Sequence, residues 1–330
     1  MQVIAGIDIG GTKCALSFAR LRQREIVFLE KEKWKTDTEN FSVTIKTFIR
    51  AIQKYLNKNK DWELAAVGIS CGGPLNVQKG VILSPPNLKR WDNVDIYTPL
   101  REAFHVPVLM QNDADACALA EWRLGTGRDC KNMIFLTFGT GMGAGLILNG
   151  ALYSGTTGMA GEIGHIRMEE TGPFGYGKNG SFEGFCSGGG IANLGRTLAQ
   201  KALEAGEPPL FCGSFQELES IDAKKISEAY SQGDALAKQI FDTVGHYLGR
   251  GLAILIDVLN PEVIVIGSIY GRQKAALDEK MLQALKQEAL PASRKACRIV
   301  PASLGERIGD YAAVTVGLMA LEAEVFGEGN

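Results

Sequence analysis

The chain lacks an excess of charge of either sign. Its 330 residues contain 35 Lys and Arg against 37 Asp and Glu, which gives a formal net charge of -2 at pH 7. Neither half carries a basic stripe or a Lys/Arg cluster interleaved with aromatic residues, the pattern that marks nucleic-acid-binding surfaces. The Lys-rich stretch 54–60 is typical of a solvated helix end. We therefore expect no nucleic-acid partner.

Long hydrophobic runs are also missing. The most apolar helical stretch, 252–259, is interrupted by Asp257 and is too short to span a bilayer. The first residues run directly into an apolar strand, without the basic start and long apolar segment of a signal peptide. These absences predict a cytoplasmic protein with no membrane partner.

Cysteine pairs and flexible linkers are absent too. The seven cysteines are scattered along the chain, odd in number and never spaced as CxxC. This usage predicts reduced, mostly buried thiols and no disulfide framework. Because no linker is rich enough in Pro, Gly or Ser to mark a flexible boundary, we expect the two halves of the chain to be joined by structured elements.

The chain contains the same order of predicted secondary-structure elements twice. With 45% hydrophobic and 22% charged residues, it is long enough for two domains, each with its own core. In each half, three short strands precede alternating helices and strands, which predicts a mixed sheet in each domain and a cleft between them. The predicted strands are 1–7, 14–19, 24–31, 64–70, 106–111, 132–138, 144–148, 163–168, 262–266 and 298–301, and the predicted helices are 41–56, 114–124, 234–259, 273–290 and 311–325.

Two glycine-rich turns lie between apolar strands. They are Asp8-Ile9-Gly10-Gly11-Thr12-Lys13 near the start and Gly139-Thr140-Gly141-Met142-Gly143 in the middle. Glycine lets backbone N–H groups approach phosphate oxygens. Asp8 ends an apolar strand and would be poorly paired unless a cation such as Mg²⁺ meets it. The alternative for either turn alone is an ordinary hairpin in which glycine supplies positive φ angles.

The second turn also fits a loose dinucleotide-binding pattern, Gly139-x-Gly141-x-x-Ala144. That pattern must open a helix, and here it opens the apparent strand 145–148. A Walker A sequence, GxxxxGK[ST], is absent from the chain. The two turns therefore favour a pair of phosphate-binding hairpins over a Rossmann turn.

Several polar side chains complete the candidate site. Asn112 and Asp113 follow the strand 106–111, at the carboxyl end where open α/β sheets place their ligands. Asp113 could serve only as the N-cap of the next helix, or it could accept the proton of a hydroxyl that attacks a phosphoryl group. Asn112, Glu162, His165 and Glu183 could hydrogen-bond the hydroxyls of a sugar, although a lone histidine is more often structural.

These residues together resemble the ROK family, named for its repressors, open reading frames and sugar kinases. The segments that carry the resemblance are the turn 8–13, Gln111-Asn112-Asp113-Ala114, Leu136–Gly143 and Ala160–His165, in the family's order and spacing. The resemblance covers nearly the whole chain. It implies an actin-like ATPase fold, an α/β fold of two similar ribonuclease H-like domains with mixed sheets around a cleft. The first domain would span 1–113, with a C-terminal helix at about 311–330 packing back on it, and the second 114–310.

The resemblance also implies an activity and the roles of residues. ATP and Mg²⁺ would phosphorylate a hydroxyl of a hexose or N-acetylhexosamine, with Asp113 as the general base and Asp8 holding the Mg²⁺. A homodimer is expected on the same ground. The implied sugar contacts are Asn87, Asn112, Glu162, His165 and Glu183, and the implied ATP contacts are Asp8, Gly10, Gly11, Thr12, Lys13, Thr137, Gly139, Thr140, Gly141, Gly143 and Gly267.

One departure from the family concerns zinc. Many members carry a zinc motif of the form CxCGxxGCxE, but the matching stretch 174–183 contains no cysteine. A structural zinc needs about four N, S or O ligands, which His165 and Ser181 cannot supply. We therefore predict no zinc site, and we expect packing of Phe174, Tyr176 and Phe182 to hold this loop.

The sequence leaves the sugar open among glucose, N-acetylglucosamine, N-acetylmannosamine, fructose and allose. The alternative function is a non-catalytic sugar sensor or regulator of the same family. Family repressors carry an N-terminal helix-turn-helix, and we expect none here because the chain leads directly into its first strand.

Overall fold

The N-terminal half forms a five-stranded mixed sheet. In this computed structural model, which describes residues 1–23 and 25–327, the strand order is β3-β2-β1-β4-β8. The first three strands are antiparallel, whereas β4 runs parallel to β1 and β8 parallel to β4. The bounds are β1 Gln2–Ile9, β2 Lys13–Arg22, β3 Glu25–Lys35, β4 Glu63–Cys71 and β8 Val108–Asn112. The predicted meander is confirmed, and Arg24, where its third strand was expected to begin, lies outside the described residues.

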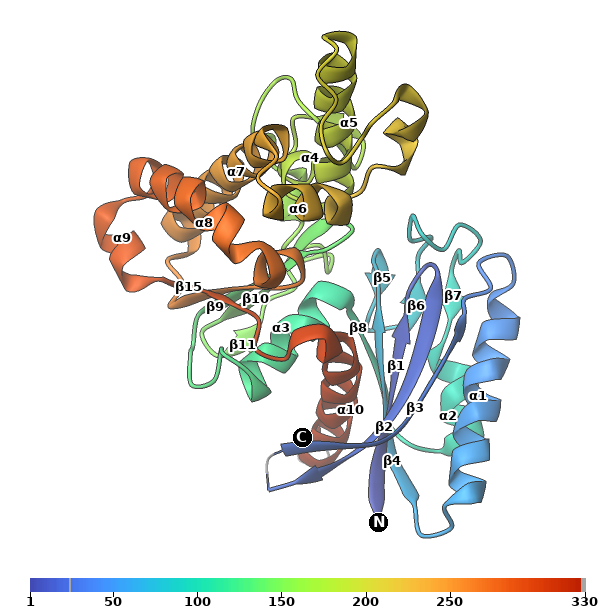
Figure 1. The fold of residues 1–330 in the computed structure, drawn as a ribbon. Helices are drawn as coiled ribbons and strands as arrows, with labels where there is room; N and C mark the ends of the chain where they lie inside the picture. Colours follow the sequence, from blue (N-terminus) through green and yellow to red (C-terminus); the bar gives the residue numbers. More distant parts are fainter. Residues whose placement is uncertain (24, 328–330) are drawn as a thin grey trace.

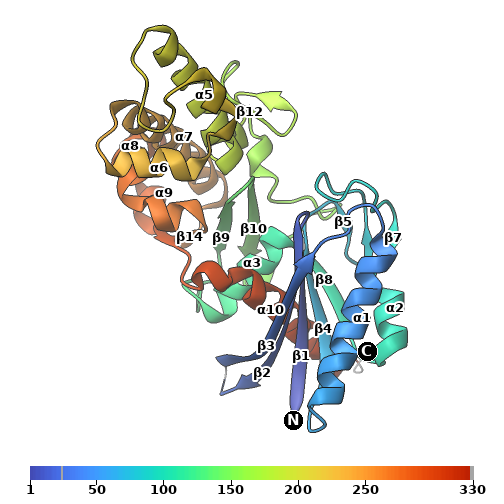
Figure 2. The ribbon, with the colours of Figure 1, turned by 45° about the vertical axis from the view of Figure 1, so that its right-hand side comes forward.

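Helices cover both faces of this sheet. α1 (Phe41–Lys58) and α2 (Tyr97–Phe104) lie on one face, and α10 (Ile308–Gly327) lies on the other (Figures 1 and 2). α1 buries Ile45, Phe48 and Ile52, as expected for an amphipathic helix whose apolar stripe faces a core. An unpredicted small sheet of β5 (Leu75–Asn76), β6 (Val81–Ile82) and β7 (Val94–Asp95) is inserted between β4 and α2.

The C-terminal half repeats the topology of the first sheet. Its strand order is β11-β10-β9-β14-β15, again three antiparallel strands followed by two parallel ones. The duplicated plan predicted from the sequence is therefore confirmed. The bounds are β9 Met133–Phe138, β10 Met142–Leu148, β11 Ala151–Leu152, β14 Val263–Ile266 and β15 Arg298–Pro301.

Helices also surround the second sheet. The long helix α7 (Ala235–Leu259) confirms the prediction at 234–259. The helix predicted at 273–290 begins earlier, as α8 (Ile269–Glu288), and bends at Gln273, whose backbone is not helical. The other helices are α3 Asp113–Leu124, α4 Phe182–Phe185, α5 Gly188–Glu204, α6 Ala223–Ser231 and α9 Pro291–Ala296, of which only α3 was predicted.

The predicted strand at 163–168 is wrong. Residues Ile163–His165 form a short 3₁₀-helix, and the third strand of the repeat is β11. Gly161, with φ +89°, turns the chain before this segment, and the Ile163 N–H bonds the Gly161 carbonyl instead of a neighbouring strand. Ile163 and Met168 are apolar because they enter the core, not because they belong to a sheet. A two-stranded hairpin, β12 (Phe174–Gly175) and β13 (Lys178–Asn179), follows.

The C-terminal helix returns to the first sheet. α10 packs against β1, β4 and α3, and it does so with almost no side chain between it and β4. A Cβ added at Gly68 in β4 would lie 2.1 Å from both the Ala313 carbonyl oxygen and the Gly317 nitrogen. Residues 328–330, the end of the helix expected at 311–330, lie outside the described residues, and the division of the chain at 113/114 stays a prediction.

The cysteines agree with the expected reduced state. All seven are free, and six of them are buried, with Cys297 partly exposed. In the described part of the chain, no helix has both the length and the apolar character needed to cross a membrane.

Candidate active site

The first glycine turn is a tight hairpin braced from the side. The Gly10 N–H donates to the Lys13 carbonyl at 3.2 Å, and the Thr36 hydroxyl donates to the Gly10 carbonyl at 2.6 Å. A Cβ at Gly11 would lie 2.5 Å from the Asn87 Cβ. Any residue larger than glycine would clash with Asn87 at position 11. Asn87, a predicted sugar contact, therefore lies directly against the predicted phosphate turn.

The second glycine turn is also a hairpin. The Gly139 N–H donates to the Gly141 carbonyl at 3.1 Å. The Thr137 hydroxyl accepts from the Gly143 N–H at 2.8 Å and donates to the Gly143 carbonyl at 3.3 Å. Because the turn opens strand β10 and not a helix, the Rossmann alternative is excluded.

Two further chain segments meet this second turn. The Gly188 N–H, at the start of α5, donates to the Gly139 carbonyl at 2.7 Å. The Gly267 N–H donates to the Leu136 carbonyl at 2.9 Å, and Ser268 follows with φ +50° where glycine would be favoured. Gly267 therefore lies beside the strand that leads into the second turn. The glycines that open α5 were missed, although the run Ser187-Gly188-Gly189-Gly190 is visible in the sequence.

Asp8 lies at the end of β1 against the first turn of α10. A Cβ at Gly309 would lie 2.9 Å from Asp8 Oδ2. Burial, followed by the charges of Asp113 and Asp310, raises the pKa of Asp8 to about 6, while Lys31 and Lys13 oppose the shift. The Lys31 ammonium is hydrogen-bonded to Asp310. Asp8 is therefore an incompletely neutralised carboxylate, the kind of group that a divalent cation would pair.

Asn112 and Asp113 stand at the start of α3, at the carboxyl end of β8. The N-cap is Asn112, not Asp113: its Oδ1 accepts from the Ala114 N–H at 2.9 Å. Asp113 is the first helical residue, and its Oδ1 accepts from the same N–H at 2.8 Å. Asp113 keeps solvent-exposed surface, yet the protein atoms that crowd its carboxylate desolvate it, and this desolvation raises its pKa.

The predicted sugar acids lie close to Asp113 and to the second turn. Burial raises the pKa of Glu162, with the charges of Asp113 and Glu183 adding to the shift and His165 opposing it. Glu183 Oε2 accepts from the Met142 N–H at 3.0 Å. The charges of Glu183 and Asp113 therefore act on Glu162. Glu183 also stabilises the second turn through its hydrogen bond to Met142.

His165 is held by the hairpin β12–β13. Its ring meets the Tyr176 ring edge to face, with the centroids 4.6 Å apart. Its carbonyl accepts from Lys178 Nζ at 2.7 Å. The hairpin that stands where family members carry a zinc motif thus positions a predicted sugar contact.

The loop 174–183 is not held as expected. Phe174 and Tyr176 are 56% and 50% exposed, and only Phe182 is buried, so the prediction of a three-ring packing is wrong. The loop is held by Ser181, whose hydroxyl donates to the Gly175 carbonyl at 3.1 Å and accepts from the Gly184 N–H at 3.0 Å. Within residues 1–23 and 25–327, no three His, Cys, Asp or Glu side chains are grouped to hold a metal ion.

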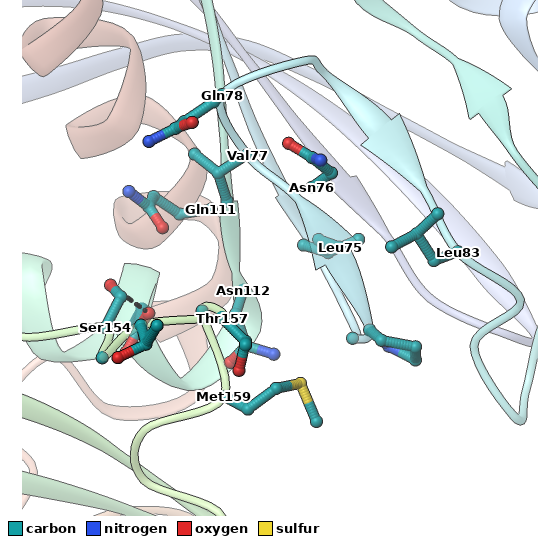
Figure 3. Close-up of a pocket in the computed structure, with 16 residues that line it drawn as sticks. Leu75, Asn76, Val77, Gln78, Leu83, Gln111, Asn112, Ser154, Thr157 and Met159 are labelled. Carbon is teal, nitrogen blue, oxygen red and sulfur yellow. Dashed lines mark hydrogen bonds between the residues drawn. The ribbon is translucent and has the colours of Figure 1, made fainter.

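A cavity of about 370 Å³ opens beside Asn112 (Figure 3). Of the predicted sugar contacts, only Asn112 lines it, whereas Asn87, Glu162, His165 and Glu183 do not. Sequence reasoning missed Asp115, Gln111 and Ser154, which do.

Comparison with known proteins shows which family this chain resembles in sequence. The model of the ROK family matches residues 4–319. A glucokinase from Halalkalibacterium halodurans is 33% identical over 311 residues, covering 92% of this chain and 91% of the relative. The DNA-binding transcriptional dual regulator NagC of Escherichia coli is 30% identical over 275 residues, covering 82% of this chain and 64% of the regulator.

A solved structure extends the similarity to three dimensions. A ROK family glucokinase from Streptomyces griseus, in complex with glucose and AMPPNP, matches with a TM-score of 0.76 and 26% identity, covering 96% of this chain and 99% of that one. Together with the two sheets of equal topology, this match confirms the actin-like ATPase fold expected from the sequence.

Proposed function

This chain belongs to the ROK family, and from that premise we propose that it is an ATP-dependent kinase for a hydroxyl of a hexose or N-acetylhexosamine. The observation that carries the proposal is the pair Asp8 and Asp113. These acids stand at the carboxyl ends of β1 and β8, within range of each other's charge. Asp8 leads into the first glycine hairpin, and Ala114, next to Asp113, would lie 3.8 Å from a Cβ added at Gly143 of the second. Two carboxylates beside two backbone-lined turns suit phosphoryl transfer to a hydroxyl.

In the proposed mechanism, Asp113 accepts the proton of the attacking hydroxyl. Its burial-raised pKa makes it a stronger base than a surface carboxylate while leaving it ionised above that pKa. Asp8 would hold Mg²⁺, which when bound neutralises charge on the transferred phosphoryl group. The other residues of the site orient the two substrates, and this positioning accounts for much of the rate enhancement.

Binding is divided between the two halves of the chain. The turn containing Gly10, Gly11, Thr12 and Lys13 and the turn containing Gly139, Thr140, Gly141 and Gly143 would hold the phosphates, with Thr137 bracing the second and Gly267 near the adenosine. Asn87, Asn112, Glu162, His165 and Glu183 would hold the sugar. The similarity to glucokinases supports this assignment.

The test is sugar-dependent ADP release. Glucose, N-acetylglucosamine, N-acetylmannosamine, fructose and allose are offered with Mg-ATP in a coupled assay, and we expect at least one to be phosphorylated. The similarity to NagC favours a second candidate, a sugar-binding regulator. Calorimetric binding of a sugar with no ADP release for any member of the panel would favour that candidate and contradict the kinase.

The pH profile provides a second prediction. Asp8 and Asp113 must both be ionised to act, and burial raises the pKa of each, to about 6 for Asp8. Because a raised pKa means that the proton is retained to higher pH, kcat/KM should fall as pH is lowered through about 6. Initial rates between about pH 5 and 8 measure this effect, and a flat profile across that range would contradict it.

Metal content gives a third prediction. We propose that the protein folds and acts without zinc, since Ser181 supplies through hydrogen bonds the bracing that a metal would give the loop 174–183. Elemental analysis of the purified protein should find far less than one zinc per chain. Activity with excess Mg²⁺ should also survive a zinc-selective chelator. Stoichiometric zinc would overturn this proposal.

A further inference from the structure

The chain passes between its two large sheets at two crossings. It leaves the first sheet through α3, which connects β8 to β9, and it returns through the segment 302–307, which connects β15 to α10. α3 packs on β9 and β10, α10 packs on β1 and β4, and the two helices pack against each other (Figures 1 and 2). Asp113 begins α3, and Gly309, in the first turn of α10, lies against Asp8. The relative position of these two helices therefore affects how Asp113 and Asp8 are placed.

One buried carboxylate joins the two crossings. Glu121, near the C-terminal end of α3, is 0% exposed. Its Oε1 accepts from the Leu304 N–H at 2.8 Å, and its Oε2 accepts from the Ser303 hydroxyl at 3.0 Å and from the Thr126 N–H at 2.9 Å. Two of these donors belong to the returning segment 302–307, and the third belongs to the turn in which α3 ends.

The backbone of this turn leaves room for the carboxylate. A Cβ added at Gly125 would lie 2.0 Å from Glu121 Oε2 and 2.7 Å from Ser303 Oγ. The Gly125 and Gly127 N–H groups both donate to the Glu121 carbonyl at 3.0 Å. The side chain and the backbone of Glu121 together therefore order the end of α3 and attach the returning segment to it.

Among the described residues, Glu121 is paired with hydrogen-bond donors and forms no ion pair with Lys, Arg or His. Replacement of a buried ionic group by a hydrocarbon of similar volume is often neutral or stabilising, so stability alone does not explain a carboxylate here. A fully satisfied buried polar network rigidifies a structure and specifies one arrangement of the elements it joins. The hydrogen bonds of Glu121 therefore specify how the segment 302–307 lies on α3.

We propose that Glu121 is a positioning residue for phosphoryl transfer: by attaching the segment before α10 to the end of α3, it fixes the placement of Asp113 relative to Asp8. This inference rests on the proposed function. Glu121 lies on the same helix as Asp113, about 12 Å further along its axis, so it acts through the helix and not on the reacting groups. A misplacement of about 1 Å can cost about 10²-fold in rate, so a small shift of α3 against α10 is enough.

The test replaces Glu121 by Gln in the whole chain. The carboxamide keeps the shape of the side chain, but in either orientation its NH₂ group faces a backbone N–H that the carboxylate accepts, from Leu304 or from Thr126. With the sugar that the panel identifies, kcat should fall about tenfold because Asp113 is misplaced. Calorimetric binding of that sugar should change less than about twofold, since the variant removes no group that contacts the sugar. Unchanged kcat in a folded variant, or an equal loss of kcat and binding, would overturn the proposal.

Glu262→Gln is the matched control. Glu262 Oε1 also accepts from two backbone N–H groups, those of Lys131 and Asn132, at 2.8 and 2.9 Å. These hydrogen bonds join the starts of β9 and β14, two strands of the same sheet, and not the two crossings. This variant should keep kcat within about twofold of the parent, and a loss as large as that of Glu121→Gln would contradict a special role for Glu121.

Ser303→Ala tests whether the effect passes through the returning segment. The variant removes one hydrogen bond to Glu121 and should lower kcat about threefold. Combined with Glu121→Gln, it should lower kcat little further, because side chains that act as one unit are not additive. Fully multiplicative losses would overturn the proposal. If Glu121→Gln does not fold, Ser303→Ala decides alone, and a normal kcat for it would count against the proposal.

Hydrogen exchange separates failure of this inference from failure of the kinase. Glu121→Gln should speed amide exchange in peptides that cover 302–310 and the first turn of α3, whereas Glu262→Gln should speed exchange in neither. Faster exchange at both places without ADP release for any sugar would keep the coupling of the two helices and reject the kinase. An active kinase whose kcat and exchange are unchanged by Glu121→Gln would reject the inference alone.

Discussion

Replacement of Asp113 by Asn is expected to reduce turnover by about 10²- to 10⁴-fold, the usual contribution of a positioned general base. The amide cannot accept the proton of the attacking hydroxyl. Its Oδ1 can still accept from the Ala114 N–H, as the carboxylate does at 2.8 Å, so the start of α3 should keep its shape. The measurement is kcat with the sugar that the panel identifies, together with calorimetric binding of that sugar, which should be largely unchanged.

The control for this experiment is Asp61→Asn. Asp61 is exposed in the turn between α1 and β4, and only its backbone carbonyl takes part in a hydrogen bond. The same change of charge there should leave turnover within about twofold, as expected for surface substitutions. Near-normal turnover of Asp113→Asn would remove the general base from the mechanism.

Replacement of Gly68 by Ala is expected to lower the free energy of unfolding by about 3 kcal/mol, the upper part of the range for overpacking a core. The added Cβ would lie 2.1 Å from two backbone atoms of α10, the Ala313 oxygen and the Gly317 nitrogen. Backbone cannot rotate away as a side chain can, so α10 must move off β4. Chemical denaturation measures the loss, and an unchanged midpoint would show that α10 packs differently.

Gly271→Ala is the matched control for this substitution. It makes the same change in helix α8, where an added Cβ meets nothing within 4 Å. Because alanine favours helix over glycine by up to about 1 kcal/mol, this variant should be as stable as the parent or slightly more so. The contrast between the two variants isolates the close approach of α10 to the sheet. Since Gly309 of the same helix lies against Asp8, the Gly68 variant should also lose activity.

Local patterns were enough to locate most of the strands and long helices. Alternating and continuous apolar runs identified β1, β4, β8 and β9, and a helical stripe identified α1, because each of these elements buries a regular face. The strand predicted at 163–168 was wrong because this segment does not bury a regular face. Its apolar residues are buried by an irregular turn after Gly161, and periodicity cannot distinguish that from a strand.

In the candidate site, too, some residues could be recognised from the sequence and others could not. The glycine turns and Asp113 could be recognised because their spacing within a few residues carries the chemistry. Asp115 was not recognised, because its hydrogen bond with Ser154, 39 residues away, exists only in the folded chain. The support of the loop 174–183 was also misjudged, since hydrogen bonds of the Ser181 hydroxyl leave no periodic trace.

The family resemblance, the duplicated order of elements and the two turns could be recognised from the amino-acid sequence, because each depends on residues that are neighbours along the chain. The folded structure was needed to show that α10 lies directly on β4, that Asp8 and Asp113 share one electrostatic environment, and that a cavity adjoins Asn112. Those properties depend on contacts between distant segments. Burial, and the pKa shifts that burial produces, exist only after the two halves have packed together.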